Sequence, residues 1–516
     1  MAVWDLFVRS SGDSGSPGRG TALAVVGIVG LWVVTTYVFW VGYAGADDLF
    51  YARYAYLLHR PPINWWEFRL PAVLAMRASF AAFGPSELAA SVPTLLSSLL
   101  ILACVAWQVD WLKRPGWETT LGVLFACTLP LDVGFRSVPL AGFLAAGLLG
   151  VGTVCVLRGE RRLATIGSLL LAAGFATHEV SFFYVAIFCL TLLAFDMGRF
   201  WKPVATCVAV SGALLAIECL GYYLLLGDGL ARIRTAAATT ATLQVGVDPD
   251  THMSGTQFFL WPIRSALFSK PFGVDLLLLV TAGMATWRRL ERDQKILLCT
   301  TLGVYLWLGY GTQVPWSYRP FYRQFHYYFP LTLGVAAVLP FAVRQAVGKH
   351  VWVGRGLLLI ALGIHMLCLG LGGRWGENVA VSQQLLRYAT QRPSQRFVTD
   401  VGTMNHMYVV LGFRLPANVV CVNGPAVEQH LILNKEPAGT PRFIFPQGHV
   451  DGLLVNLEEA YQRPLEAEFL ALLEGRQEHH LQIAPVRYRR VFLPLLPFIE
   501  PQPYMIRSLG GVFVPA

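Results

Sequence analysis

Long apolar stretches recur along the first three quarters of the chain and are separated by short polar segments. An α-helix needs about 20 mostly apolar residues to cross a membrane. Roughly eleven stretches meet this requirement, and the pattern predicts a spanning helix in each. They lie near residues 21–43, 89–112, 117–131, 138–157, 163–177, 180–196, 203–226, 272–287, 296–312, 327–343 and 356–373.

The apolar pattern ends near residue 373, and mixed helix and strand signals follow. Short β-branched and aromatic runs at Arg396–Asp400, Asn418–Val422 and Arg442–Phe445 predict strands. The amphipathic stretch Leu457–Glu478 predicts a helix. We therefore expect an α-helical polytopic membrane protein with three parts. These are a polar tail (1–20), a transmembrane domain (21–373) and a small α/β domain (374–516).

Composition supports this reading and excludes several classes of protein. Apolar residues make up 55% of the chain and charged residues 14%, and the mean hydropathy is +0.52. Soluble proteins carry about 25% charged residues, and a soluble protein this apolar would expose large hydrophobic patches. An ordinary soluble enzyme, a disordered chain and a disulfide-rich secreted module are excluded. Eight of the nine cysteines lie in predicted spans, and Cys421 is alone in the last domain, so we expect no structural disulfide.

The charge distribution predicts how the chain is oriented. The formal net charge is +9, and clusters of Lys and Arg recur at every second connection between spans. This is the positive-inside pattern of membrane proteins, so we expect a cytoplasmic N-terminus and no nucleic-acid partner. An odd number of spans then places the last domain outside the plasma (inner) membrane. The outer connections are 44–88, 227–271 and 313–326, with a short one at 132–137.

The first outer connection carries a cluster of polar and aromatic residues. Asp47 and Asp48 directly follow the first span. Two adjacent carboxylates at a membrane boundary are costly to desolvate, although Asp also suits the N-terminus of a helix. Further along come Tyr51 on a short aromatic helix, Arg60-Pro61-Pro62, Arg69 with Pro71, the motif Phe83-Gly84-Pro85-Ser86-Glu87, and a second span that contains Pro93.

This segment resembles the GT-C membrane glycosyltransferases that use polyprenyl-phosphate sugars, such as protein O-mannosyltransferases and the aminoarabinose transferase of lipid A. That family has an Asp-Glu pair, a Tyr-Ala helix, a Lys/His-Pro-Pro stretch and a Phe-Gly-x-Ser-Glu motif. Asp47 matches the Asp, Asp48 stands where Glu is usual, and Phe83–Glu87 matches well. Arg60 matches the Pro-Pro element by letter, whereas Arg69 matches it by distance from the later motif. Weaker matches are Leu131-Asp132, Gly174–His178 and Arg323–Pro330.

The resemblance implies transfer of a sugar through an oxocarbenium-like transition state. The leaving phosphate needs cations, and the planar fork of Arg suits it. The acceptor hydroxyl needs a base, which a carboxylate can supply. The resemblance therefore implies Asp47 as the base and Asp48 as a residue that orients or tunes it. The residues it implies for the carrier phosphate are Arg69, Arg60, Arg323 and His178.

Several further candidates keep two interpretations. Asp132 is either a helix cap or a second acidic site that contacts donor, acceptor or, with Asp47 and Asp48, a divalent cation. His178 and Glu179 lie between two predicted spans, where they cap a helix or reach the phosphate. A cluster rich in aromatic and basic residues is either an interfacial belt or a lipid-phosphate cradle. Its members are Arg319, Arg323, His326 and Tyr328, and together with Tyr51 and Glu179 they are candidates to line the cavity.

Two functions follow from these observations. The first is a glycosyltransferase that moves one sugar from a polyprenyl phosphate to a hydroxyl of a lipid, polysaccharide or protein at the outer face of the membrane. The alternative is a transporter or flippase for a lipid or a lipid-linked sugar, which makes no bond. Transporters commonly show internal repeats and polar residues near the midplane. This sequence shows no repeat, and its ionisable residues crowd the outer boundary, which favours the enzyme.

Overall fold

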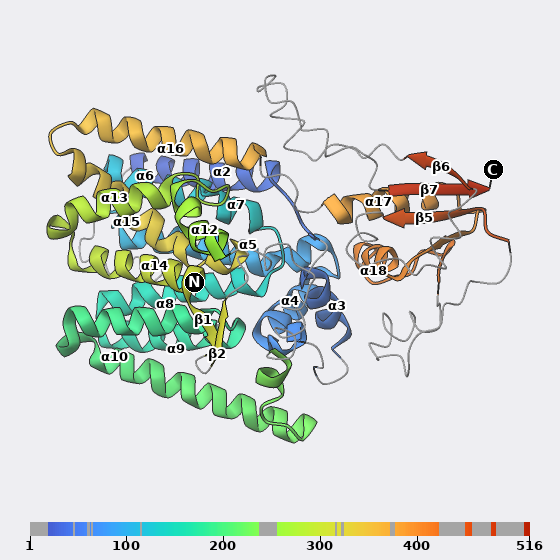
Figure 1. Cartoon of the computed structure of the whole chain (residues 1–516), viewed down its shortest axis with the longest axis horizontal. Helices are drawn as coiled ribbons and strands as arrows, with labels where there is room; N and C mark the ends of the chain where they lie inside the picture. The colour runs from blue at the N-terminus through green and yellow to red at the C-terminus, as the bar shows by residue number, and fades with distance from the viewer. Residues whose placement is uncertain are drawn as a thin grey trace.

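A helical bundle and an α/β domain lie side by side, with two shorter helices between them (Figure 1). The structure is a computed structural model. It describes residues 19–44, 47–58, 62, 65–113, 116–236, 255–314, 317–320, 325–371, 377–422, 449–456, 476–480 and 510–515.

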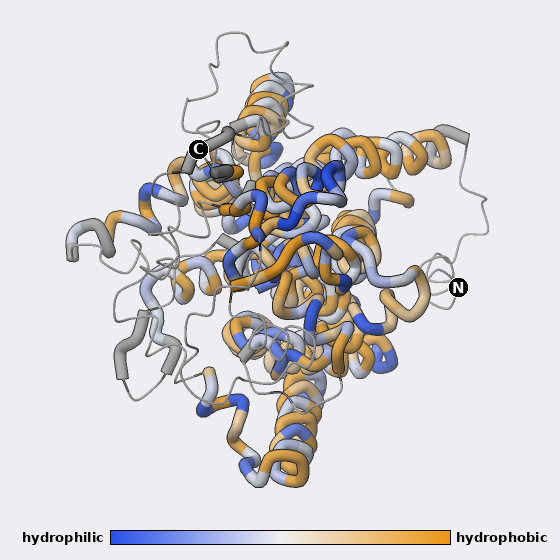
Figure 2. Tube along the Cα trace, turned by 90° about the vertical axis from the view of Figure 1, so that its right-hand side faces the viewer, coloured by the Kyte–Doolittle hydropathy of each residue, from blue (hydrophilic) through white to orange (hydrophobic). Residues whose placement is uncertain are grey.

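Helices occupy all the ranges predicted to span the membrane, and hydrophobic residues dominate them (Figure 2). By length and composition, α5, α6 with α7, α8, α10 and α16 could each cross a membrane. The chain is therefore a membrane protein, whereas the number of eleven spans stays a prediction. The bundle consists of α2 (Arg19–Val38), α5 (Glu87–Gln108), α6 (Trp117–Thr128), α7 (Pro130–Phe135), α8 (Ala141–Arg158), α9 (Arg161–Thr177), α10 (Ser181–Leu226), α13 (Asp275–Thr286), α14 (Arg292–Tyr310), α15 (Leu331–Val347) and α16 (Val351–Leu371).

Helices α10 and α15 show how the helices of the bundle are shaped and packed. Helix α10 joins two predicted spans across a kink at Asp196, whose φ of −162° and ψ of 78° are not helical. Helix α15 packs against α6, α13 and α14, and all its residues from Leu331 to Pro340 are buried. A helix that is apolar on every side belongs in the core, so α15 forms the centre around which the neighbouring helices pack.

The outer connections contain more regular structure than the sequence predicted. Connection 44–88 holds α3 (Asp47–Leu57), the 3-10 helix η1 (Trp65–Phe68) and α4 (Leu70–Phe83). The other two hold α12 (Gly255–Leu267), the hairpin of β1 (Thr312–Val314) and β2 (Ser317–Pro320), and the 3-10 helix η4 (Phe325–Tyr328). The short connection at 132–137 is helical up to Phe135, where α7 ends.

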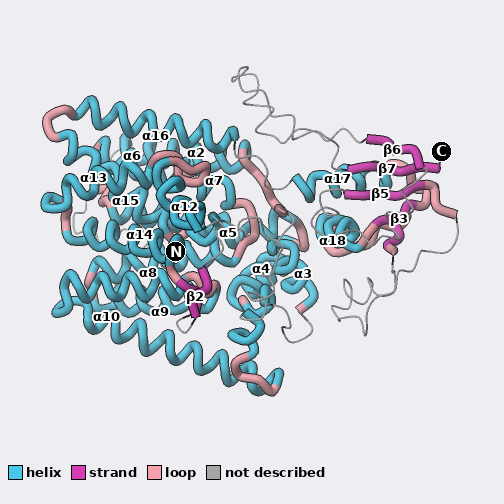
Figure 3. Tube along the Cα trace, viewed as in Figure 1, coloured by secondary structure: helices cyan, strands magenta, loops and turns pink. Residues whose placement is uncertain are grey.

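The last part of the chain forms a five-stranded sheet with helices α17 (Glu377–Thr390) and α18 (Val401–Val410) (Figure 3). The strand order is β4-β3-β5-β7-β6, in which β3 runs parallel to β4 and β5, and β7 runs antiparallel to β5 and β6. The strands are β3 (Phe397–Thr399), β4 (Val419–Cys421), β5 (Gly452–Asn456), β6 (Arg476–His480) and β7 (Gly510–Pro515).

The structure confirms two of the three strands predicted in this domain. Strands β3 and β4 lie within the predicted ranges at 396–400 and 418–422. The predicted strand at Arg442–Phe445 lies outside the described residues. The predicted helix Leu457–Glu478 was wrong at its end, because β6 begins at Arg476, and the rest of that range is outside the described residues.

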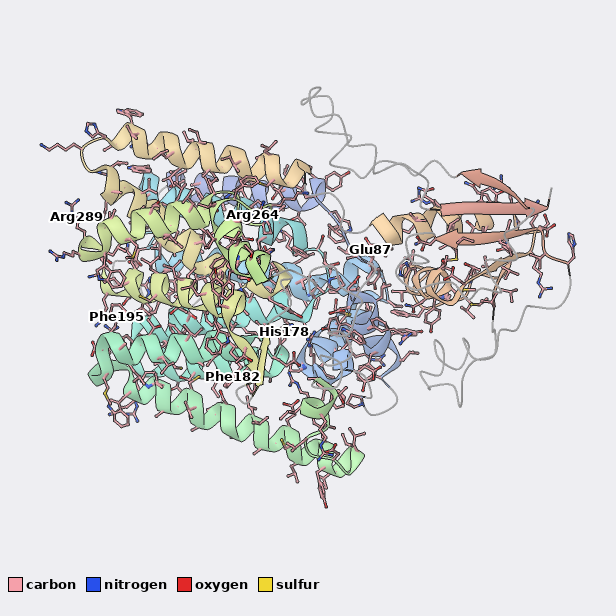
Figure 4. The ribbon with its side chains drawn as sticks, viewed as in Figure 1. Glu87, His178, Phe182, Phe195, Arg264 and Arg289 are labelled. Carbon is pink, nitrogen blue, oxygen red and sulfur yellow. The ribbon has the colours of Figure 1, made fainter. Side chains whose placement is uncertain are left out.

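The two ends of the bundle differ in charge and in their neighbours. At one end, basic side chains contact the backbone of neighbouring connections. Arg199 donates to the carbonyl of Leu157 at 2.9 Å, and Arg289 donates to that of Gln345 at 3.3 Å. Figure 4 shows Arg289 at the end farthest from the α/β domain, and Glu87 and His178 at the end beside it. The basic connections and the candidate site therefore lie at opposite ends of the bundle.

A buried ion pair joins three helices of the bundle near its α/β-domain end. Arg136 contacts Asp132 at 2.7 Å, and both side chains are almost fully buried. Asp132 also accepts a hydrogen bond of 2.9 Å from Ser98 in α5, and Arg136 donates to Thr35 and Thr36 in α2 at 3.3 and 3.2 Å. Because charges buried in a bundle must be paired, this network fixes α2, α5 and α7 against one another.

We predict that Asp132→Asn destabilises the protein by about 3 kcal/mol, because it leaves the Arg136 charge buried without a counter-charge. The matched control is Asp110→Asn, which breaks the partly exposed ion pair with Arg158 and should cost less than about 1 kcal/mol. Asn tolerates the φ of 50° at position 110. Unfolding of both variants in detergent would measure the difference. Equal stability of the two would contradict the structural role of the buried pair.

Candidate active site

The two adjacent carboxylates of the first outer connection point to different partners. Asp48 is fully buried, and its Oδ2 accepts a hydrogen bond of 2.7 Å from the Ala44 backbone N–H, in the segment before α3. Asp47, the first residue of α3, is half-buried and accepts a hydrogen bond from the Trp66 side chain. Asp48 therefore ties the start of α3 to the segment before it, and Asp47 faces η1 and the residues that follow it.

Asp47 lies in an environment that raises the pKa of its carboxyl. Burial raises the pKa of its carboxyl, and the negative charge of Glu179 raises the pKa further. The Arg69 cation and the hydrogen bond from Trp66 oppose this rise, but the pKa remains above its usual value. A carboxylate whose pKa is raised in this way accepts a proton more readily than an ordinary Asp.

Arg69 is a buried cation held in place from two sides. It lies between η1 and α4, and 3% of its surface is exposed. Its Nε donates to Glu179 at 3.0 Å, and its Nη1 donates to the Tyr51 hydroxyl. Its guanidinium carbon also lies 5.8 Å from the centre of the Tyr51 ring. Because Tyr51 is one turn after Asp47 on α3, this contact brings the cation to the helix that carries the candidate base.

Glu179 bridges two arginines. Its other oxygen accepts hydrogen bonds from Nε and Nη2 of Arg232 at 3.1 and 2.9 Å, and Arg232 also donates to Glu218 of α10 at 2.8 Å. Burial alone would raise the pKa of Glu179, but Arg69 and Arg232 outweigh burial and hold that pKa well below its usual range. Glu179 is thus an anion at neutral pH, and two guanidinium groups converge on it.

Sequence reasoning missed Arg232, although a signal was present. The residue lies in the outer connection 227–271, and the positive-inside rule disfavours basic residues there. A basic residue that breaks this rule needs a local partner or a function. The structure supplies the partners, Glu179 and Glu218.

His178 and the late 3-10 helix η4 approach the same cluster. His178 is buried at the end of α9, and its Nδ1 accepts a hydrogen bond of 3.3 Å from the Val180 backbone N–H. Its ring centre lies 5.9 Å from that of Tyr327, and Tyr327 is close enough to Arg69 to raise the pKa of the guanidinium. Residues from four separate connections between bundle helices therefore gather around Arg69 and Glu179.

Other sequence candidates do not join this cluster as described. Tyr328 lies in the core, where its ring packs against those of Trp261, Phe272 and Tyr305 with centre distances of 5.6 to 6.4 Å. Asp132 is committed to the ion pair with Arg136.

The structure does not describe the side chains of the remaining candidates. Arg60 and Arg323 lie outside the described residues, and Arg319 in β2 and His326 in η4 are described only by their backbone. Among the described residues, no group of three His, Cys, Asp or Glu side chains could hold a metal ion.

Comparisons with known proteins place the fold. No protein-family model and no curated protein sequence matches the chain. Two solved structures of ArnT from Cupriavidus metallidurans are similar to it, one in the apo state and one bound to undecaprenyl phosphate. Their TM-scores are 0.51, with 13% and 12% identity, over 95% and 97% of this chain and 97% and 98% of theirs. The likeness shows the fold, and it confirms the GT-C fold that the sequence resemblance implied.

A third structure is less similar. It is an oligosaccharyltransferase from Archaeoglobus fulgidus in complex with Zn and sulfate, with a TM-score of 0.47 and 11% identity. The match covers 86% of this chain and 69% of that one.

Proposed function

We propose that this chain is a membrane glycosyltransferase that moves a single sugar from a polyprenyl-phosphate carrier to an acceptor hydroxyl. The observation that carries the proposal is the buried cation Arg69 near the half-buried Asp47, whose carboxyl pKa it lowers against the effect of burial, in a chain with the GT-C fold. The bound undecaprenyl phosphate of one similar structure supports a polyprenyl carrier. The acceptor belongs to a lipid, a polysaccharide or a protein.

The proposed orientation follows from the charges at the two ends of the bundle. The end rich in Arg, which includes Arg289, faces the cytoplasm by the positive-inside rule. The end with Asp47, Arg69 and the α/β domain then faces outward from the plasma membrane. This places the reacting groups at the level where the phosphate of a membrane-embedded carrier meets water.

In the proposed reaction, the oxygen of the acceptor hydroxyl bonds to the anomeric carbon of the sugar, and the carboxylate of Asp47 takes the proton of that hydroxyl. The bond from that carbon to the phosphate oxygen breaks, and both its electrons leave with the phosphate. Arg69 stabilises the extra negative charge of the polyprenyl phosphate product. Attack opposite the leaving phosphate inverts the anomeric configuration. Arg232, held through Glu179, is placed to assist Arg69.

The first test compares the two neighbouring carboxylates. Asp47→Asn removes the base and should lower sugar transfer by about 100- to 10,000-fold, with donor binding retained. Asp48→Asn keeps an oxygen that accepts from the Ala44 N–H, so it should lose far less activity. Transfer from a synthetic polyprenyl-phosphate sugar by purified protein measures both. An Asp47→Asn variant that works at the wild-type rate would disprove the assignment of the base.

A second test uses the pH dependence of kcat/KM. Protonation of Asp47 at low pH should abolish transfer, with a midpoint above the usual pKa of Asp. Arg69→Gln removes the cation that lowers the Asp47 pKa, so this acidic midpoint should rise. Glu179→Gln removes the anion that raises the same pKa, so the midpoint should fall. Shifts in the same direction in both variants would show that another group controls the profile.

A further inference from the structure

The motif Phe83–Glu87 forms the turn between α4 and α5. Gly84 has a φ of 76°, and Ser86 caps α5 by accepting a hydrogen bond of 3.2 Å from the Ala89 N–H. Glu87 begins α5 and lies at the end of the bundle beside the α/β domain (Figure 4).

Glu87 holds the segment that leads into α3. Its Oε1 accepts a hydrogen bond of 2.7 Å from the indole N–H of Trp40. Gly42 has a φ of 72°, and a Cβ at this position would lie 2.1 Å from the same oxygen. Only glycine therefore lets the chain pass so close to the carboxylate. The segment 40–44 ends with Ala44, which donates to Asp48 at the start of α3.

The α/β domain contacts the same motif. Gln383 of α17 donates to Oε2 of Glu87 at 3.4 Å. Gly412, just after α18, has a φ of 66°, and a Cβ there would lie 2.7 Å from the Pro85 carbonyl oxygen. The turn after α18 thus packs closely against the motif.

The next residue of that turn, Phe413, reaches the far end of α3. Its ring stacks on Tyr56 with a centre distance of 4.3 Å and meets Phe80 of α4 edge-on at 5.7 Å. Phe413 has a φ of 65°, which is rare for a bulky residue and costs energy. The surrounding aromatic contacts offset that strain. The strained backbone thus keeps the ring in contact with α3 and α4.

We propose that the Phe83–Glu87 motif is a docking joint through which the α/β domain positions Asp47, and that Glu87 is the positioning residue at its centre. The proposal rests on the role proposed for Asp47. Helix α3 is held at its start through Glu87, Trp40 and segment 40–44, and near its end through Tyr56 and Phe413. Because Asp47 is the first residue of α3, release of either end changes its placement relative to Arg69.

The test measures both hydrogen exchange in α3 and transfer kinetics in the full-length protein in detergent. Glu87→Ala should speed amide exchange in α3 about tenfold. It should lower kcat about 100-fold while the donor KM stays within about twofold, since a small misplacement of a reacting group is costly. Glu87→Gln keeps an oxygen for Trp40 and should recover most of kcat. Phe413→Ala removes the contact that the α/β domain makes with Tyr56, so it should also speed exchange in α3.

The matched control is Ser86→Ala, which weakens the same helix start but keeps the Glu87 carboxylate. Its kcat and its α3 exchange should stay within about twofold of the wild type, because a lost cap is a local change. The proposal is overturned if Ser86→Ala reproduces Glu87→Ala, or if neither Glu87→Ala nor Phe413→Ala alters exchange in α3. A wild-type protein without transfer activity would instead refute the proposed function, and the exchange data would still test the joint.

Discussion

The guanidinium of Arg69, buried where the bundle meets the α/β domain, is the interaction on which this end of the molecule depends. A buried charge is tolerated only when neighbouring groups compensate it. Glu179 compensates Arg69 at 3.0 Å, Tyr51 accepts its second hydrogen bond, and Asp47 lies within its field. The requirement to satisfy one cation thus draws together α3, α4 and the connection between α9 and α10.

The same constraint explains how identical neighbours acquire different roles. The carboxylate of Asp48 accepts a hydrogen bond from the backbone N–H of Ala44, and the residue is fully buried. Asp47 remains half-buried, with a raised pKa and a cation beside it. The raised pKa of Asp47 and the nearby cation support the proposal that Asp47 takes the proton of the acceptor hydroxyl.

Local patterns in the sequence predicted the elements, and tertiary contacts account for what they missed. Apolar length placed the bundle helices, and β-branched runs placed β3 and β4, because both signals are local. Asp275 and His365 form a buried pair, with 2.7 Å between Oδ2 and Nε2. They are 90 positions apart, and no local sequence pattern near either residue predicts this contact. Asp47 and Arg69 were found through the family resemblance. The Arg232–Glu179 contact joins residues at the two ends of α10, 53 positions apart, so spacing alone could not reveal it.

The most direct measurement of the central claim is the identity of the lipid that stays with the protein. The chain would be purified from its native membrane and analysed by native mass spectrometry, beside an Arg69→Gln variant. The account predicts a polyprenyl phosphate, bare or carrying one sugar, on the wild type and its loss from the variant. A stoichiometric amphiphile that lacks a polyprenyl phosphate, bound equally to both proteins, would contradict the account and favour a transporter.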